Sequence, residues 1–542
     1  MRAHGLRRAA ALVLLLLAVR PALAAAPDQV LRVALSTELQ VLDPLVTTIN
    51  ATRVFAYLVF DTLVGVDGHG NYKPQMLDGW EVSQDRLTWT FRLRDGLEWS
   101  DGAPVTAEDC VASIRRWAKR EPLGGKLMAA AADLHALDAR SFVLVLNRPF
   151  ALVIEALGKP GHTIPVMMPT RLAAHDPSTQ APEIVGSGPF LFLRDEWRPG
   201  ERASFVRNPR YRPRPEPADG LSGGKSVKVD RVELISIPDL ATKAAALEAG
   251  EIDYVEIAPL DYIERLRRNP AITVGAPRGV DQFLAVLNIN HAAPPFDNVL
   301  VRRAAQAAVL QPEVMDAMGL PPDLVTSYCG SIYMCGTPGA SEAGTDALQV
   351  AGTQRAQALL REAGYHGEPV VFLHAQTSAL LNPVGLVMSD QLRRAGFNVD
   401  LRSSDYATVA QKRLSRAPED QGGWSAVPLV LNGIDLVDPL ANPLLTFNCS
   451  PVQPGWYCDG EITTLLARYS EAATPETRRL LADKLQAAAH SDVTFIVAAS
   501  LQPLEPGVPA FPVWCRSASR CSGVSRNTEP GLLSRQFWCE DP

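Results

Sequence analysis

Apolar and polar positions alternate with the period of β-strands in the first part of the chain. Residues 31–37 (LRVALST) alternate in this way and run into a polar loop, which predicts a strand. Residues 71–97 predict paired strands, since short polar turns separate their alternating segments. A strand end that opens into a loop is a common place for ligand contacts, so Thr37 and Glu38 are candidates for a cleft mouth. Ordinary turn polarity is the alternative.

The segment after the paired strands predicts a helix over residues 106–117. Thr106 and Asp109 have the spacing of a capping box, in which each side chain binds the backbone N–H of the other. Trp99 and Trp117 are expected in the core around this helix, because large aromatic side chains are mostly buried.

Helical and strand periods alternate in the second half. Residues 354–364 predict a helix, residues 370–377 (VVFLHAQT) a buried strand, residues up to Gly396 a second helix, and residues 397–402 a strand. This order is typical of a parallel sheet covered by helices, so an α/β unit is expected here.

The stretch from Gly422 to Gly460 carries the densest set of candidate ligand contacts. It holds an apolar run, an acidic turn that begins at Asp435, and two cysteines. A carboxylate in such a turn could bind a cation of a ligand, and capping of the turn or of the next helix is the alternative. Further candidates for a ligand-binding wall, each with a structural alternative, are Trp424, Asn432 and Thr377.

The N-terminus predicts export. Arg2, Arg7 and Arg8 precede the apolar residues 9–19, and a small-residue cleavage site follows at residues 22–24. We expect residues 1–24 to be a signal peptide and the mature protein to be periplasmic and soluble, without a lipid anchor because no cysteine follows the cleavage site. The arginine pair leaves the general and the twin-arginine routes open.

Length, charge and cysteines narrow the class further. The chain has 542 residues and a net charge of -7 with both signs interspersed, which predicts several domains and argues against a nucleic-acid partner. No CxxC or HExxH motif occurs, so no metal site is expected. The close spacings of Cys329 to Cys335 and of Cys449 to Cys458 predict two local disulfides, each able to contribute roughly 2.5 kcal/mol.

Several landmarks resemble one known family and follow its order along the chain. They are the run VFDTLVGVDGHGNYKPQMLDGWEVSQDRLTWTFRLRDGLEWSDGAPVTAEDCVASIRRW, VGSGPF (185–190), RNPRY (207–211), the segments 229–256 and 287–309, and QLRRAGFNVDLRSSDY. Together they resemble the extracytoplasmic solute-binding proteins of family 5, the peptide-, nickel- and opine-binding subunits of ABC importers. The resemblance extends to about residue 496.

This resemblance implies an α/β, two-lobed periplasmic-binding-protein fold of the large type II class, closing over a central cleft. Lobe I would take residues 27–278, with a subsidiary domain at about 74–183, and lobe II residues 279–491. The strand at 281–290 would cross into lobe II, and the chain near 493–498 would begin the return to lobe I, which residues 492–542 would complete.

The resemblance also implies a function. It predicts a periplasmic receptor, not an enzyme, that captures a peptide or another small solute by lobe closure and delivers it to the membrane permease subunits of an ABC importer. Such a receptor would be a monomer without a cofactor.

Asp435 resembles a residue with a known role in that family. In peptide-binding members, an acidic residue four positions before the proline of an Asp-Pro pair binds the α-ammonium of the ligand, and Asp435 has this spacing from Pro439. Those members often carry a tryptophan just before the acidic residue, where this chain has Leu431 and Asn432. The resemblance therefore implies an amine-bearing solute without establishing a peptide.

The chain from about residue 497 departs from the resemblance. Residues 515–529 (CRSASRCSGVSRNTE) can be encoded so that the frame starting at the third base of each codon reads PVGLPVFWGVEKH and then a stop, which resembles the family's C-terminal ending. We therefore predict that residues 497–542 are out of frame, with the shift between about 497 and 505. Independent genomic reads are expected to show the shift, and an unbroken frame encoding the printed tail would contradict it.

Two other classes fit parts of the sequence. A GxSxG motif with Ser222 at its centre, as in secreted hydrolases, occurs at residues 220–224. A Pro-rich loop precedes it and no helix follows, which argues against a nucleophile elbow. A sensor or chaperone built on the same fold is the second alternative, and the sequence does not name the solute.

Overall fold

The computed structural model describes most of the chain beyond the N-terminal segment. The described residues are 29–67, 70–256, 260–274, 282–319, 329–337, 339–378, 380–450, 453–472, 474–500 and 513–515. The expected signal peptide and most of the tail that we predict to be out of frame lie outside them.

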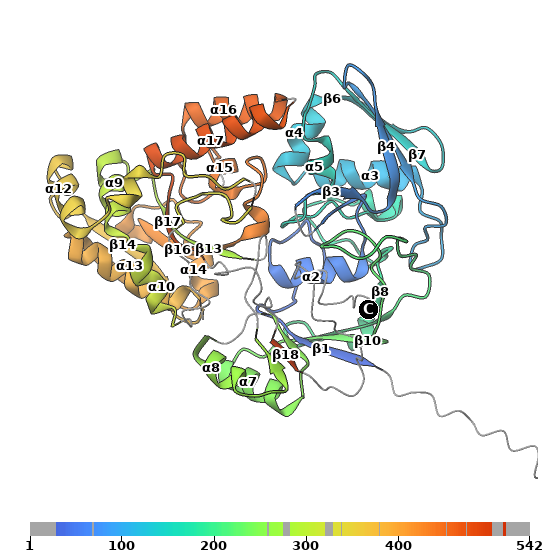
Figure 1. Ribbon diagram of the computed structural model, residues 1–542, viewed down its shortest axis with the longest axis horizontal. Helices are drawn as coiled ribbons and strands as arrows, with labels where there is room; N and C mark the ends of the chain where they lie inside the picture. The colour runs from blue at the N-terminus through green and yellow to red at the C-terminus, as the bar shows by residue number, and fades with distance from the viewer. Residues whose placement is uncertain are drawn as a thin grey trace, which may run out of the picture.

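A seven-stranded mixed sheet forms the base of one half of the molecule, which we call lobe I (Figure 1). In spatial order its strands are β12 (Ile272–Thr273), β18 (Val513–Cys515), β11 (Tyr254–Val255), β1 (Val30–Ala34), β10 (Arg231–Ile235), β9 (Arg202–Arg207) and β8 (Phe190–Phe192). β1 runs parallel to both β10 and β11, so the loop after β1 leaves from the carboxyl edge of the sheet. The predicted first strand is thus confirmed, and Thr37 and Glu38 follow it.

Helix α2 (Asn50–Val59) packs against this sheet through an aromatic cluster. The ring centre of Phe55 lies 5.2 Å from that of Phe192 and 5.8 Å from that of Phe205. At the end of the helix, a Cβ added at Gly186 would overlap the carbonyl oxygen of Val59, so the VGSGPF landmark provides the room that α2 needs. Both contacts fix the position of α2, which carries a site residue described below.

A four-stranded antiparallel sheet with helices on one side completes lobe I. The strands, in order, are β4 (Leu77–Val82), β5 (Thr88–Leu93), β7 (Ser141–Leu146) and β6 (Ala131–Ala136), beside α3 (Ala107–Ala118), α4 (Pro122–Ala130), α5 (Val153–Leu157), α6 (Thr170–Ala173) and the pair β2 (Val64–Val66) and β3 (Tyr72–Pro74). The capping box of Thr106 and Asp109 is present at the start of α3, as predicted. Trp99 and Trp117 are each 1% exposed, which confirms that both belong to the core.

A five-stranded sheet organises the other half, lobe II. Its order is β15 (Asn398–Ser404), β14 (Pro369–Ala375), β16 (Ala426–Asn432), β13 (Phe283–Ile289) and β17 (Phe495–Ser500). β14 is parallel to β15 and β16, whereas β13 is antiparallel to β16 and β17. Helices α9 (Val299–Ala308), α10 (Gln311–Ala317), α12 (Thr353–Ala363) and α13 (Leu381–Ala395) lie along it (Figure 1). The predicted α/β alternation is confirmed.

The remaining elements are short helices and one long pair. They are α7 (Leu240–Ala249), α8 (Ile263–Arg267), α11 (Asp346–Gln349), α14 (Tyr406–Lys412), α15 (Pro443–Thr446), α16 (Gly460–Glu471), α17 (Pro475–Asp492), and the 3-10 turns η1 (Arg194–Glu196), η2 (Leu260–Tyr262), η5 (Glu419–Gln421) and η6 (Gly433–Asp435). Both predicted disulfides, Cys329 to Cys335 and Cys449 to Cys458, are formed.

Among the described strands, the chain changes from one lobe sheet to the other at two points. It leaves the lobe I sheet after β12 and enters the lobe II sheet at β13, and it returns between β17 and β18. Residues 495–500 form the buried strand β17 beside β13 in lobe II, and the next described residues, those of β18, lie in the lobe I sheet. β18, within the tail that we predict to be out of frame, pairs with β11 and β12.

The two lobes are in contact along the side formed by α4, α5, α16 and α17 (Figure 1). Glu155 of α5 pairs with Arg478 of α17 at 2.8 Å, and the N–H of Ala151 donates to the carbonyl of Ser470 at 2.9 Å. A single apolar cluster contains buried side chains of both lobes, among them Leu157, Tyr333, Leu436 and Leu440. The two lobes are thus in direct contact in this structure.

Candidate functional site

Asp435 of lobe II reaches across to lobe I. It ends the turn η6, which begins directly after β16, and its side chain is 9% exposed. One carboxylate oxygen, Oδ1, accepts the backbone N–H of His162 at 3.1 Å and lies 3.2 Å from the Nδ1 atom of that ring. The other, Oδ2, lies 3.9 Å from Nη1 of Arg53. A carboxylate from one lobe is therefore held by two residues of the other.

The charges around Asp435 keep it ionised. Burial by itself raises the pKa of this carboxyl, but the electrostatic interaction and hydrogen bond with His162, together with the positive charges of Arg53 and Lys159, outweigh burial and hold its pKa well below the usual range. A buried carboxylate that stays charged is suited to bind a cation.

Gly161 makes room for this contact. A Cβ added at Gly161 would overlap Oδ1 of Asp435, so a larger side chain there is incompatible with the observed approach of the lobes. The residue thus matters for the fit between lobes rather than for a turn.

Arg53 is a buried cation held by a row of polar side chains on lobe I. It is 8% exposed, and its guanidinium donates to the side-chain oxygen of Asn50. Asn50 in turn donates to Glu256, which also accepts the backbone N–H and the hydroxyl of Ser36, both at 2.7 Å. The Nε atom of Arg53 is buried without a hydrogen-bond partner among the described residues. This row links the loop after β1 to Asp435.

Asn432 and Thr377 belong to the same edge of lobe II as Asp435. Asn432 is the last residue of β16, and Thr377 follows β14, which runs parallel to β16. Since the carboxyl ends of parallel strands meet at one edge, these candidates lie on the edge where α/β proteins bind ligands. Thr377 is exposed, and its hydroxyl accepts the N–H of Tyr406 at 3.0 Å.

Trp424 lies away from this edge. It precedes β16, at the opposite end of the strand from Asn432, which corresponds to about 25 Å along an extended chain. The side chain is fully buried, its indole N–H donates to the carbonyl of Arg413 at 2.8 Å, and it packs against Trp456. In this structure Trp424 supports the sheet and presents no surface to a ligand.

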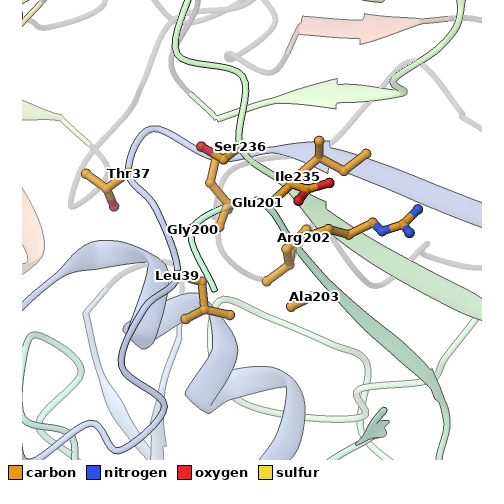
Figure 2. A pocket seen from close by; sticks show the side chains of 10 residues that line it. Thr37, Leu39, Gly200, Glu201, Arg202, Ala203, Ile235 and Ser236 are labelled. Atoms are coloured by element: carbon orange, nitrogen blue, oxygen red, sulfur yellow. The ribbon is translucent and has the colours of Figure 1, made fainter. Parts of the chain in front are cut away.

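Thr37 and Glu38 are exposed at the end of β1 on lobe I. The hydroxyl of Thr37 accepts the N–H of Ala51 at 3.3 Å, next to the start of α2, and Glu38 accepts a hydrogen bond from Gln40. Figure 2 shows the residues that line a small pocket behind this loop, among them Thr37, Leu39 and Ser236. Asp435 does not line this pocket, which is distinct from the contact between the lobes.

Asp438, the other acidic residue of the turn, has a structural role. One of its oxygens accepts the N–H of Leu440 at 2.8 Å and the other accepts the hydroxyl of Tyr469 at 3.1 Å. Burial, with a further contribution from nearby Glu155, raises its pKa to about 6. The turn therefore directs the carboxylate of Asp435 towards lobe I, whereas the carboxylate of Asp438 stabilises the local structure of lobe II.

The hydrolase motif does not form a nucleophile elbow. Ser222 is buried in a turn, and its hydroxyl donates to the carbonyl of Asp219 at 2.8 Å. Within the described ranges, no three His, Cys, Asp or Glu side chains gather in a way that could hold a metal ion. None of the helices in the described part of the chain is long and apolar enough to cross a membrane.

Arg53, Gly161 and His162 were not predicted from the sequence. Arg53 did carry a signal, because it is the one charged residue in α2 (NATRVFAYLV) and the structure buries it. Gly161 and His162 lie in the loop KPGHT, and nothing in that loop indicates that it meets residue 435.

Two α/β lobes that meet across a buried polar contact have the architecture of two-lobed periplasmic binding proteins. The same fold is found in the periplasmic binding protein DppA from Helicobacter pylori, solved in complex with a peptide, with a TM-score of 0.70 at 21% identity over 94% of this chain and 98% of that one. It is also found in AgaA from A. tumefacien R10, solved with agropinic acid, with a TM-score of 0.70 at 20% identity over 89% and 92% of the two chains.

The chain belongs to the bacterial extracellular solute-binding proteins, family 5, whose model matches residues 71–450. A probable peptide ABC transporter periplasmic-binding protein of Sinorhizobium fredii is 35% identical over 476 residues, which cover 86% of this chain and 88% of the relative. The nickel-binding periplasmic protein of Escherichia coli is 25% identical over 408 residues, 71% and 73% of the two chains. The protein is therefore an extracytoplasmic solute receptor that works with the permease of an ABC importer.

Proposed function

We propose that this receptor captures an amine-bearing solute, a peptide or a smaller molecule, between its lobes and that Asp435 binds the amine. The contact of Asp435 with His162 and Arg53 carries the proposal, because it puts a charged, buried carboxylate where the lobes meet. The Sinorhizobium relative is described as a peptide-transport protein, which supports the same class of solute.

Other residues of the proposed site follow from their positions. We place Asn432 and Thr377 beside Asp435 on lobe II, and Thr37 and Glu38 opposite them on lobe I. A solute that touches both walls stabilises the closed form, because only that form makes both sets of contacts. Closure is the signal that we expect the permease to recognise.

The proposal extends to the state of the mature protein. We propose a monomer that lacks residues 1–24, has lobe boundaries near residues 278 and 491, binds no nucleic acid and catalyses no reaction. Ser222 donates its hydroxyl to a backbone carbonyl, which supports the last point.

Thermal denaturation of the purified mature chain tests the proposed function. A panel of peptides, free amino acids, amino acid conjugates and nickel complexes is added in turn, and a specific solute is expected to raise the melting temperature. At a concentration 100 times Kd, mass action stabilises the folded state by about 2.7 kcal/mol.

A panel in which amines raise the melting temperature and matched N-acetylated compounds do not would support the role of Asp435. Stabilisation by N-acetylated compounds to the same extent would contradict it. Turnover of any panel member would contradict the absence of catalysis.

A further inference from the structure

Arg53 is a fixed positive charge inside the proposed site. Its side chain is 9% exposed, and its ion-pair partner is Asp435, at 3.9 Å. That distance is too long for a hydrogen bond, so the two groups form an ion pair without a hydrogen bond between them. Among the described residues, the Nε–H group of Arg53 has no hydrogen-bond partner, and Oδ2 is the carboxylate oxygen of Asp435 that faces the guanidinium.

Binding of an amine to Asp435 would reduce the compensation of the positive charge of Arg53. An ammonium that binds the Asp435 carboxylate competes with the buried guanidinium for the negative charge that faces it, and a buried charge without full compensation is unfavourable. Asn50 is neutral and cannot compensate it. Glu256 stands behind Asn50, where Ser36 and Asn50 already occupy its oxygens.

A solute avoids this cost if it brings an anion for Arg53 next to its ammonium. A carboxylate is the natural choice, because a guanidinium offers parallel N–H groups that match its two oxygens. The close approach of Arg53 to Asp435 also limits how far apart the two charges of the solute can be.

We propose that Arg53 binds a carboxylate of the solute, and that the receptor selects solutes whose ammonium and carboxylate sit on the same carbon atom. Such a head group belongs to an amino acid that is extended through its side chain, as in a γ-glutamyl compound. An ordinary peptide instead has a neutral amide carbonyl next to its ammonium, and Arg53 stays uncompensated. This inference rests on the proposed binding of an amine by Asp435.

Two isomeric dipeptides test the inference with matched charge and composition. In γ-glutamylglycine the ammonium and a carboxylate share one carbon, whereas in α-glutamylglycine an amide follows the ammonium. Titration calorimetry of the wild-type mature chain is expected to show at least about tenfold tighter binding of the γ isomer, equivalent to about 1.4 kcal/mol.

Substitution of Arg53 is expected to remove this preference. Arg53→Gln should bring the affinities of the two isomers within about twofold of each other, whereas Arg361→Gln, on the exposed surface of α12, should leave the ratio unchanged. If Arg53→Gln does not fold, Arg53→Lys tests the inference in its place, because lysine keeps the positive charge but lacks the planar guanidinium. The ratio of the affinities for the γ and α isomers should then fall at least about threefold.

Each outcome decides the inference separately from the proposed function. Equal binding of the isomers by the wild type, binding of neither isomer, or an unchanged ratio in the Arg53 variants overturns the inference. If another amine from the wider panel still binds in an Asp435-dependent way, the proposed function stands. If no amine binds, both fail.

Discussion

Asp435→Asn is expected to weaken solute binding by roughly 10- to 100-fold, since a hydrogen bond to a charged group contributes about 1.5–3 kcal/mol. The substitution keeps the shape of the side chain and removes its charge. In the arrangement seen here it also removes the anionic partner that Arg53 has among the described residues, and opening of the lobes relieves that cost. We therefore expect the penalty to appear in affinity and closure, with little change in the melting temperature of the solute-free protein.

Calorimetry and small-angle scattering, with and without a solute found in the panel, measure these two effects. Asp420→Asn, which changes an exposed aspartate in the 3-10 turn η5, is the matched control and should behave as the wild type. Unchanged affinity in Asp435→Asn would show that the carboxylate serves only the contact between the lobes. A large loss of melting temperature with unchanged affinity would assign Asp435 to folding.

Gly161→Ala is expected to prevent full closure. The added methyl group would occupy the position of Oδ1 of Asp435, and overpacking of this kind typically costs about 1–3 kcal/mol. The overlap exists only when the lobes are together, so each lobe should still fold. The affinity should fall by at least about fivefold, and the radius of gyration with solute should stay near that of the open form.

Gly125→Ala is the control for this substitution. A Cβ at Gly125 in α4 meets the carbonyl of Ala118 at 3.5 Å, an ordinary contact, so affinity and closure should not change. Normal closure of Gly161→Ala in scattering measurements would mean that the lobes approach differently from the arrangement described above.

The sequence predicted the parts of the fold that depend on local chemistry. The capping box of Thr106 and Asp109 and both disulfides lie within short segments, so residue types and spacing were enough. The alternation of helices and strands around β14 and β15 was also visible, because buried strands and amphipathic helices have different periods.

The composition of the site could not be predicted in the same way. His162 and Asp435 are 273 residues apart, and their contact depends on how two lobes meet, which no local pattern encodes. Trp424 shows the reverse case, in which a residue expected to contact the ligand is buried in the core. An aromatic residue near a candidate ligand site can equally pack behind it. The resemblance to a family located Asp435 but gave no information about Arg53.

The apolar cluster that contains Leu157 of lobe I and Leu436 of lobe II has a consequence for the rate of solute exchange. The lobes must separate before a solute can enter or leave, and separation exposes part of this cluster to water. Each ~100 Å² of apolar surface exposed costs about 2.5 kcal/mol, which would slow exchange about 70-fold if the surface is exposed in the transition state. Substitutions in the cluster should therefore have a large effect on the residence time of the solute and only a small effect on which solutes the receptor binds.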